Sequence, residues 1–223
     1  MTTAEQGAAV PTTREKLVEL AAGLARTHTS LKRAPLLTPR LADVPALGTA
    51  MATAARAFRA SPKPDDVGYQ KAGEWLLDNY YVCERALRQV KSELPSGFRR
   101  HLPHAGTDVL PRVLFIARAL VRATSLDLDL PTLEAFVEAY QTHSPLTVAE
   151  LWALPTMLRL AVLEVLVQTL DMLLLRRESR QGQFDLVVDP ALAVERCVRI
   201  LRLLAEIDWK AFFGKSSVVE SIL

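Results

Sequence analysis

The chain has 223 residues, of which half are hydrophobic, 6% aromatic and 23% charged, with 27 basic side chains against 25 acidic ones. This composition is too apolar for a disordered chain, and its near-neutral charge excludes nucleic acid as an expected partner. Only nine glycines are present, which argues against a β-sandwich or barrel because those folds need a turn every ~8–12 residues. A folded, helical protein is therefore expected.

Apolar residues recur at the spacing of one helical face along most of the chain, and capping residues or prolines mark several helix starts. The pattern predicts an all-α protein of about seven to nine helices, packed as an irregular multi-helix bundle. Segment 67–90 is predicted to form one uninterrupted helix. The predicted helices cover residues 12–28, 47–58, 67–90, 111–121, 131–140, 147–175 and 190–205, with another opening at 217.

A proline-punctuated basic segment separates the first predicted helix from the others. Residues 29–45 contain Pro35, Pro39 and Pro45 together with several basic side chains, a composition typical of a linker. We therefore expect two parts: residues 1–45 form an N-terminal helix and linker, and residues 46–223 form the helical bundle domain.

The most apolar segment, residues 151–175, is long enough to be considered as a membrane span. Glu164, Gln168 and Asp171 fall on one side of this helix, and each charge inside a span costs ~2.5–3.5 kcal/mol. The pattern predicts a core helix with one solvated edge. The first eleven residues lack the basic and apolar regions of a signal peptide. A cytoplasmic location is expected.

Two helices of the predicted bundle carry tryptophan on their apolar stripes. Burial of such a ring contributes ~1.5–3 kcal/mol, so Trp75 and Trp152 are expected to be largely buried and to face a shared core. Asn79 lies on the same stripe as Trp75. If it is buried, its amide should hydrogen-bond, because an unpaired buried amide costs ~1–3 kcal/mol.

Residues able to perform chemistry are few and scattered. The sequence contains none of the common phosphate-binding, nucleophile or zinc motifs. His101 and His104 could suggest a metal pair, but surface or loop histidines are the simpler interpretation. Glu74 and Asp78 could form a carboxylate pair, although this spacing is more typical of a solvated helix face. We predict no catalytic residue, cofactor or metal ion.

The two cysteines of the chain, Cys83 and Cys197, lie in apolar segments that are predicted to be helical. A disulfide between them is conceivable, but isolated cysteines in such surroundings are more often reduced core residues. Two buried free thiols are expected.

Two longer motifs stand out, GEWLLDNYYV at residues 73–82 and SPLTVAELWALPTMLRL at residues 144–160. With shorter motifs in the same order, they resemble the N-terminal region of bacterial cyclic β-1,2-glucan synthases. The shorter motifs are at residues 94–98, 111–113, 136–141, 208–209 and 217–220.

The resemblance implies a relation to large UDP-glucose-dependent glycosyltransferases of the bacterial inner membrane. The aspartate-rich nucleotide-sugar motifs of that family are absent from the sequence, so no catalytic residue carries over. We therefore expect a non-catalytic helical module, truncated at its C-terminal end relative to the family, that packs against the glycosyltransferase machinery. The implied partner is the remainder of the synthase or a related glycosyltransferase, at the cytoplasmic face of the inner membrane, with the membrane surface as a further candidate.

Two alternative functions remain open. The first is a carbohydrate-binding helical domain, in which Trp75, Tyr80, Tyr81 and Trp152 form an aromatic platform, because aromatic rings present flat apolar faces with polar edges. The second is a stand-alone protein-interaction scaffold with an exposed apolar helix face. The same four residues are the candidate contacts for a carbohydrate or for a partner.

Overall fold

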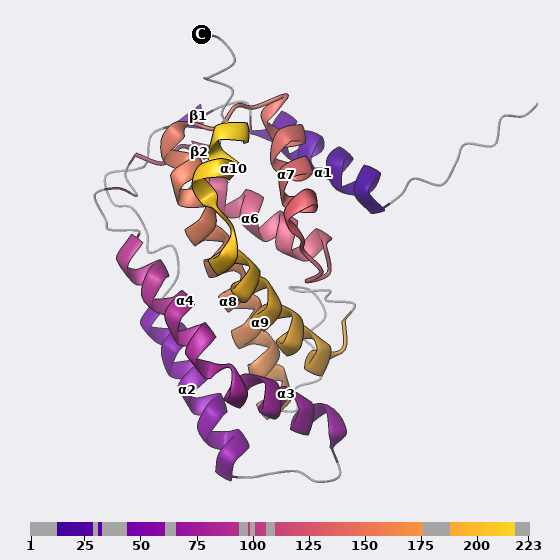
Figure 1. Ribbon diagram of the computed structural model, residues 1–223, viewed down its shortest axis with the longest axis vertical. Helices are drawn as coiled ribbons and strands as arrows, with labels where there is room; N and C mark the ends of the chain where they lie inside the picture. Colours follow the sequence, from indigo (N-terminus) through magenta and orange to yellow (C-terminus); the bar gives the residue numbers. More distant parts are fainter. Residues whose placement is uncertain are drawn as a thin grey trace, which may run out of the picture.

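The prediction of an all-α bundle is confirmed by the computed structural model, which describes residues 13–28, 31–32, 44–60, 66–93, 98, 101–105, 110–175 and 188–216 (Figure 1). Within these residues there are nine helices and one antiparallel pair of two-residue strands, β1 (Leu31–Lys32) and β2 (His104–Ala105). The helices are α1 (Thr13–Thr27), α2 (Val44–Ala60), α3 (Val67–Asp78), α4 (Tyr80–Glu93), α6 (Arg112–Ala123), α7 (Leu130–Gln141), α8 (Val148–Leu175), α9 (Pro190–Glu206) and α10 (Trp209–Ser216).

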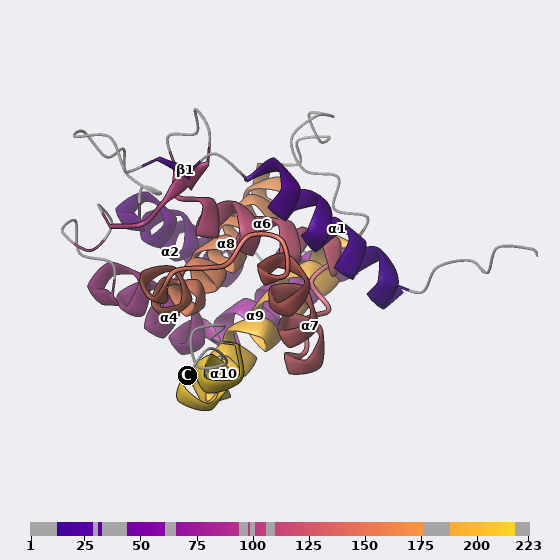
Figure 2. The same cartoon turned by 90° about the horizontal axis from the view of Figure 1, so that it is seen from above.

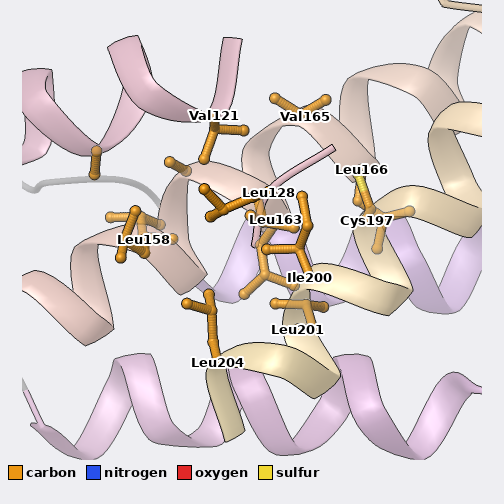
Figure 3. Close-up of a cluster of buried hydrophobic side chains, with 14 of the residues drawn as sticks. Val121, Leu128, Leu158, Leu163, Val165, Leu166, Cys197, Ile200, Leu201 and Leu204 are labelled. Atoms are coloured by element: carbon orange, nitrogen blue, oxygen red, sulfur yellow. The ribbon is translucent and has the colours of Figure 1, made fainter. Parts of the chain in front are cut away.

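Helix α8 is the centre of the bundle and contacts α2, α4, α6 and α9 (Figures 1 and 2). Its side chains from Ala153 to Leu163 are all buried. In the cluster of Figure 3, Leu158 and Leu163 of α8 lie among Val121 of α6 and Leu201 of α9. Such a helix is apolar on nearly every side because neighbouring helices cover it on nearly every side.

The solvated edge predicted for this helix is confirmed. Glu164 and Gln168 are half-buried and Asp171 is exposed, in contrast to the buried residues around them. Glu164 accepts two hydrogen bonds from Arg118 of α6, at 2.7 and 2.8 Å. None of the described helices is both long enough and apolar enough to cross a membrane.

The helix starts that the sequence places at Pro131 and at Asp189–Pro190 are confirmed by α7 and α9. Asp129 Oδ1 accepts the backbone N–H of Thr132 at 2.8 Å at the start of α7, and a proline occupies the first turn. Asp189 caps α9 in the same way. These side chains satisfy backbone donors that have no partner inside the helix.

The prediction of one helix over 67–90 is wrong, because the chain breaks at Asn79 between α3 and α4. Asn79 has φ −118° and ψ 15°, which ends the helical hydrogen-bond pattern. Its side-chain Nδ2 donates to the carbonyl of Trp75 at 2.8 Å, and Arg202 of α9 donates to its Oδ1. The break lets α3 pack on α9 while α4 packs on α8. Asn79 is buried and hydrogen-bonded, as expected.

The division of the chain at residue 45 stays a prediction, since most of 29–43 lies outside the described residues. Helix α1 contacts α6 and α7 (Figure 2). At its end, His28 and Tyr140 share a buried hydrogen bond of 2.7 Å between Nδ1 and Oη. The helix start predicted at 217 also lies outside the described residues.

Gly73 of α3 lies against the ring of Phe58 in α2, and its replacement by alanine should destabilise the fold. The added Cβ would be 2.9 Å from Cδ1 of Phe58, so the ring or the helix must move, at an expected loss of about 1–3 kcal/mol in the free energy of unfolding. Urea unfolding followed by circular dichroism would measure it. The matched control is Gly214→Ala in α10, where no atom lies within 4 Å of the added Cβ; equal losses would contradict the prediction.

Candidate functional site

The four aromatic residues singled out from the sequence have different neighbours. Trp75 is half-buried on α3, with the guanidinium carbon of Arg199 5.8 Å from its ring centroid. Tyr80 is half-buried at the start of α4, where burial, and then the charge of Glu84, raises the pKa of its hydroxyl. Tyr81 is 62% exposed and Trp152 is 64% exposed. Within the part of the chain that the structure describes, no ring contact joins any two of the four.

The expectation that Trp152 is buried is wrong. It points outward from the start of α8, one helical turn after Val148, which is 56% exposed. Leu151 and Ala153, on either side of Trp152, face the core instead. Because α8 is apolar on nearly all sides, its pattern does not distinguish the residue that faces solvent from those that face other helices.

Trp152 is the exposed member of an aromatic cluster, which we define as Trp152, Trp209, Phe212 and Phe213. The ring of Trp152 lies 5.4 Å from that of Phe213 in α10, and Phe213 also contacts Trp209 and Phe212. Phe212 is buried and anchors α10 in the core. The indole of Trp152 is therefore held in place by a neighbouring ring while much of its surface stays exposed to water.

The face of α8 that carries Trp152 continues into a polar cluster, which we define as Glu93, Thr156 and Arg159. The Thr156 hydroxyl donates to Oε2 of Glu93 at 2.5 Å, and Nη1 of Arg159 lies 3.4 Å from the same oxygen. Nη2 of Arg159 donates to the carbonyl of Leu204 at 3.0 Å. Trp209 Nε1 donates to the same carbonyl at 3.1 Å. The polar cluster thus joins α4, α8 and α9 beside the aromatic cluster.

The charges of this polar cluster differ in their access to water. The Arg159 side chain is only 6% exposed, whereas that of Glu93 is 42% exposed. The pKa of Arg159 is lowered, chiefly by burial. The negative charge of Glu93 acts to raise this pKa, and the positive charge of Arg85 acts to lower it further. Of this ion pair, Glu93 is therefore the side chain that is exposed to solvent.

A second polar network was not foreseen from the sequence, although its members belong to two of the motifs quoted above. Arg112 of α6 and Glu150 of α8 are fully buried and form two parallel hydrogen bonds, at 2.6 and 2.9 Å. Arg112 also donates to Ser144 Oγ at 2.6 Å and to the carbonyl of Pro145 at 2.7 Å. Burial acts to lower the pKa of Arg112, but the hydrogen bond and charge of Glu150 outweigh it, so the pKa is raised.

Glu150 also completes a capping box with Thr147 at the start of α8, the helix that the sequence places from residue 147. Its Oε2 accepts the backbone N–H of Thr147 at 2.9 Å, and Thr147 Oγ1 accepts the N–H of Glu150 at 3.3 Å. One carboxylate therefore ties the first turn of α8 to Arg112. This arrangement fixes the turn that displays Val148 and Trp152.

The other candidate residues are placed as follows. Glu74 and Asp78 are exposed on α3, as the solvated-face interpretation predicted. His101 is exposed. His104 is buried in β2, where its backbone pairs with Lys32 and bridges to Pro111, so the interpretation as surface or loop histidines is wrong for His104. Among the described residues, no group of three or more His, Cys, Asp and Glu side chains is placed to hold a metal ion.

Cys83 and Cys197 are free and buried, which confirms the prediction of two core thiols. Burial raises the pKa of the Cys83 thiol from 9.0 to about 12, and burial, with a contribution from Cys83, also raises the pKa of Cys197.

These thiols should make stability depend on pH in the alkaline range. A pKa that is higher in the folded chain contributes stability that is complete below pH 9.0 and is lost as the pH rises towards about 12. Unfolding in urea at a series of pH values would measure the decline. Cys83→Ala should make the decline shallower; an identical slope in the variant would contradict the prediction.

The chain is an all-α bundle that is similar in sequence to part of a glucan synthase. No protein-family model matches it. Over 132 residues, 57% of the chain, it is 36% identical to the cyclic β-(1,2)-glucan synthase NdvB of Rhizobium meliloti (strain 1021). The resemblance to this class of enzymes is confirmed. The matched stretch spans only 4% of the length of that relative.

Proposed function

We propose that the chain is a non-catalytic helical module of a glucan synthase, which docks onto the glycosyltransferase machinery. The observation that carries this proposal is the use of the charged motif residues. Arg112 of α6 pairs with Glu150 of α8, and Arg159 joins α8 to α4 and α9. These charged groups hold helices together, which supports a structural role in which the bundle presents a surface to a partner.

The proposed partner is the remainder of the synthase or a related glycosyltransferase, at the cytoplasmic face of the inner membrane. Tyr81 is the proposed docking contact, because it belongs to the motif at 73–82 and is 62% exposed. Exposed tyrosines that become buried on association often dominate the binding energy. The membrane surface is proposed as a further, weaker contact.

Co-purification with the glycosyltransferase region of the relative tests the docking. We expect the chain to be retained, Tyr81→Ala to weaken retention about tenfold or more (~1.4 kcal/mol), and Trp152→Ala, an equally exposed aromatic on another helix, to be retained normally. Absence of retention would contradict docking. Separately, the pure chain should not consume UDP-glucose, and measurable turnover would contradict the non-catalytic role.

A second candidate function is carbohydrate binding, favoured by the exposed indole of Trp152. Its ring is held by Phe213 and is 64% exposed, so an apolar sugar face can stack on it without rearrangement of the core. The ligand proposed is a β-1,2-linked glucan, the sugar in the name of the relative.

A further inference from the structure

We propose that residues 217–223, which follow α10, pack against the exposed apolar turn at the start of α8, on Val148 and Trp152. This inference goes beyond both candidate functions, because it assigns to this surface an occupant from the same chain. A sugar and residues 217–223 would compete for the ring of Trp152, so the segment would control access to it.

The surface consists of large apolar side chains that the first turn of α8 exposes to solvent. Val148 and Trp152 are both more than half exposed, and a spacing of four residues places them on one face of the helix. Phe213 of α10 extends this surface, since its half-buried ring lies 5.4 Å from that of Trp152. Removal of apolar area from water is favourable, so an apolar segment that covers this surface is stabilised there.

Helix α10 runs along α8 in the opposite direction and leads towards this turn (Figure 1). At the start of α10, Trp209 donates to the same backbone carbonyl of α9 as Arg159 of α8 does. Four residues further along α10, Phe213 contacts Trp152, which lies seven residues before Arg159. Each step along α10 therefore leads towards the first residue of α8.

Residues 217–223 begin near the level of Val148. Ser216, the last residue of α10, is three residues beyond Phe213, and Val148 is four residues before Trp152. At ~1.5 Å per residue, both steps are about 5–6 Å. Seven residues span about 10 Å even when helical, which is enough to cover both exposed side chains.

The composition of residues 217–223 suits an apolar surface. Glu220 is the one charged residue of this segment. A helix that opens at 217, as the sequence predicts, gathers the four apolar residues on one side because their spacings are one, three and four residues. These residues are Val218, Val219, Ile222 and Leu223.

A disulfide between the two surfaces tests the contact in the full chain. In a glutathione redox buffer, Val148→Cys with Ile222→Cys should form an intrachain disulfide with an effective concentration about tenfold or more above that of Tyr81→Cys with Ile222→Cys. Tyr81 is a matched control because it is comparably exposed but lies about 18 Å along α4 from the end that contacts α8. The native thiols of Cys83 and Cys197 are buried and should not compete.

Acrylamide quenching of tryptophan fluorescence tests the same contact without a cross-link. Val219→Asp with Ile222→Asp places charges on the apolar side of the segment, so quenching should increase. Ser221→Asp, on the opposite side of the predicted helix, should leave quenching unchanged. In a Trp152→Phe background, the increase caused by the two aspartates should disappear.

Equal effective concentrations for the two cysteine pairs would overturn the proposal, and so would unchanged quenching in the variant with two aspartates. A disulfide between chains, with a dimer in size-exclusion chromatography, would place a second copy of the chain on this surface instead of residues 217–223. Circular dichroism of each variant distinguishes loss of the contact from loss of the fold. Neither measurement uses a carbohydrate or the synthase, so the outcome is independent of the proposed function.

Discussion

Arg112→Met should lower the free energy of unfolding by about 3–5 kcal/mol, because it leaves the fully buried Glu150 without its counter-charge. Two further acceptors, Ser144 Oγ and the carbonyl of Pro145, would lose their donor as well. Urea unfolding followed by circular dichroism would measure the loss. Adding Glu150→Gln to the same chain should recover part of it, since the unpaired charge is then removed.

The control for this prediction is Arg88→Met in α4. Arg88 pairs with Glu84 at 3.4 Å, but both side chains are well exposed, and such surface pairs contribute about 0–1 kcal/mol. Equal losses in Arg112→Met and Arg88→Met would show that burial does not set the strength of the Arg112 pair.

Leu158→Ala is expected to destabilise the fold by about 2–5 kcal/mol, whereas Trp152→Ala should cost about 1 kcal/mol or less. Leu158 is fully buried at the centre of α8, so its truncation leaves a cavity (Figure 3). Trp152 loses mainly its contact with Phe213. Thermal melts of the two variants would measure both. A larger loss for the tryptophan would mean that its ring is buried in solution.

Local signals explain the parts of the fold that the sequence predicts well. Pro111 before α6, Pro131 in the first turn of α7 and Asp189 before α9 act on the next few residues only. The apolar face expected on α6 is buried in full, from Val113 to Val121 at helical spacing. These features depend only on residues within one or two helical turns, and such neighbours can be read directly from the sequence.

The features that the sequence does not predict depend on distant partners. Arg112 and Glu150 are 38 positions apart, and nothing local shows that an arginine at a helix start is buried. Asn79 ends α3 with help from Arg202, which is 123 positions away. The same holds for the candidate site. The sequence singles out Trp152, but it does not show that Glu93 and Arg159 lie together, because only the packing of α4 on α8 brings them into contact.

The hydrogen bond between His28 and Tyr140 gives the first helix a role in the electrostatics of the bundle. The guanidinium carbon of Arg112 lies 5.8 Å from the centroid of the Tyr140 ring, so the ring that His28 contacts lies beside the Arg112–Glu150 pair. Attraction between two charges grows as the local dielectric constant falls. Deletion of residues 1–45 would admit water beside Tyr140 and raise the local dielectric constant. The attraction between Arg112 and Glu150, which belong to the predicted bundle domain, would then weaken. The N-terminal helix therefore contributes, through His28 and Tyr140, to the strength of the Arg112–Glu150 pair.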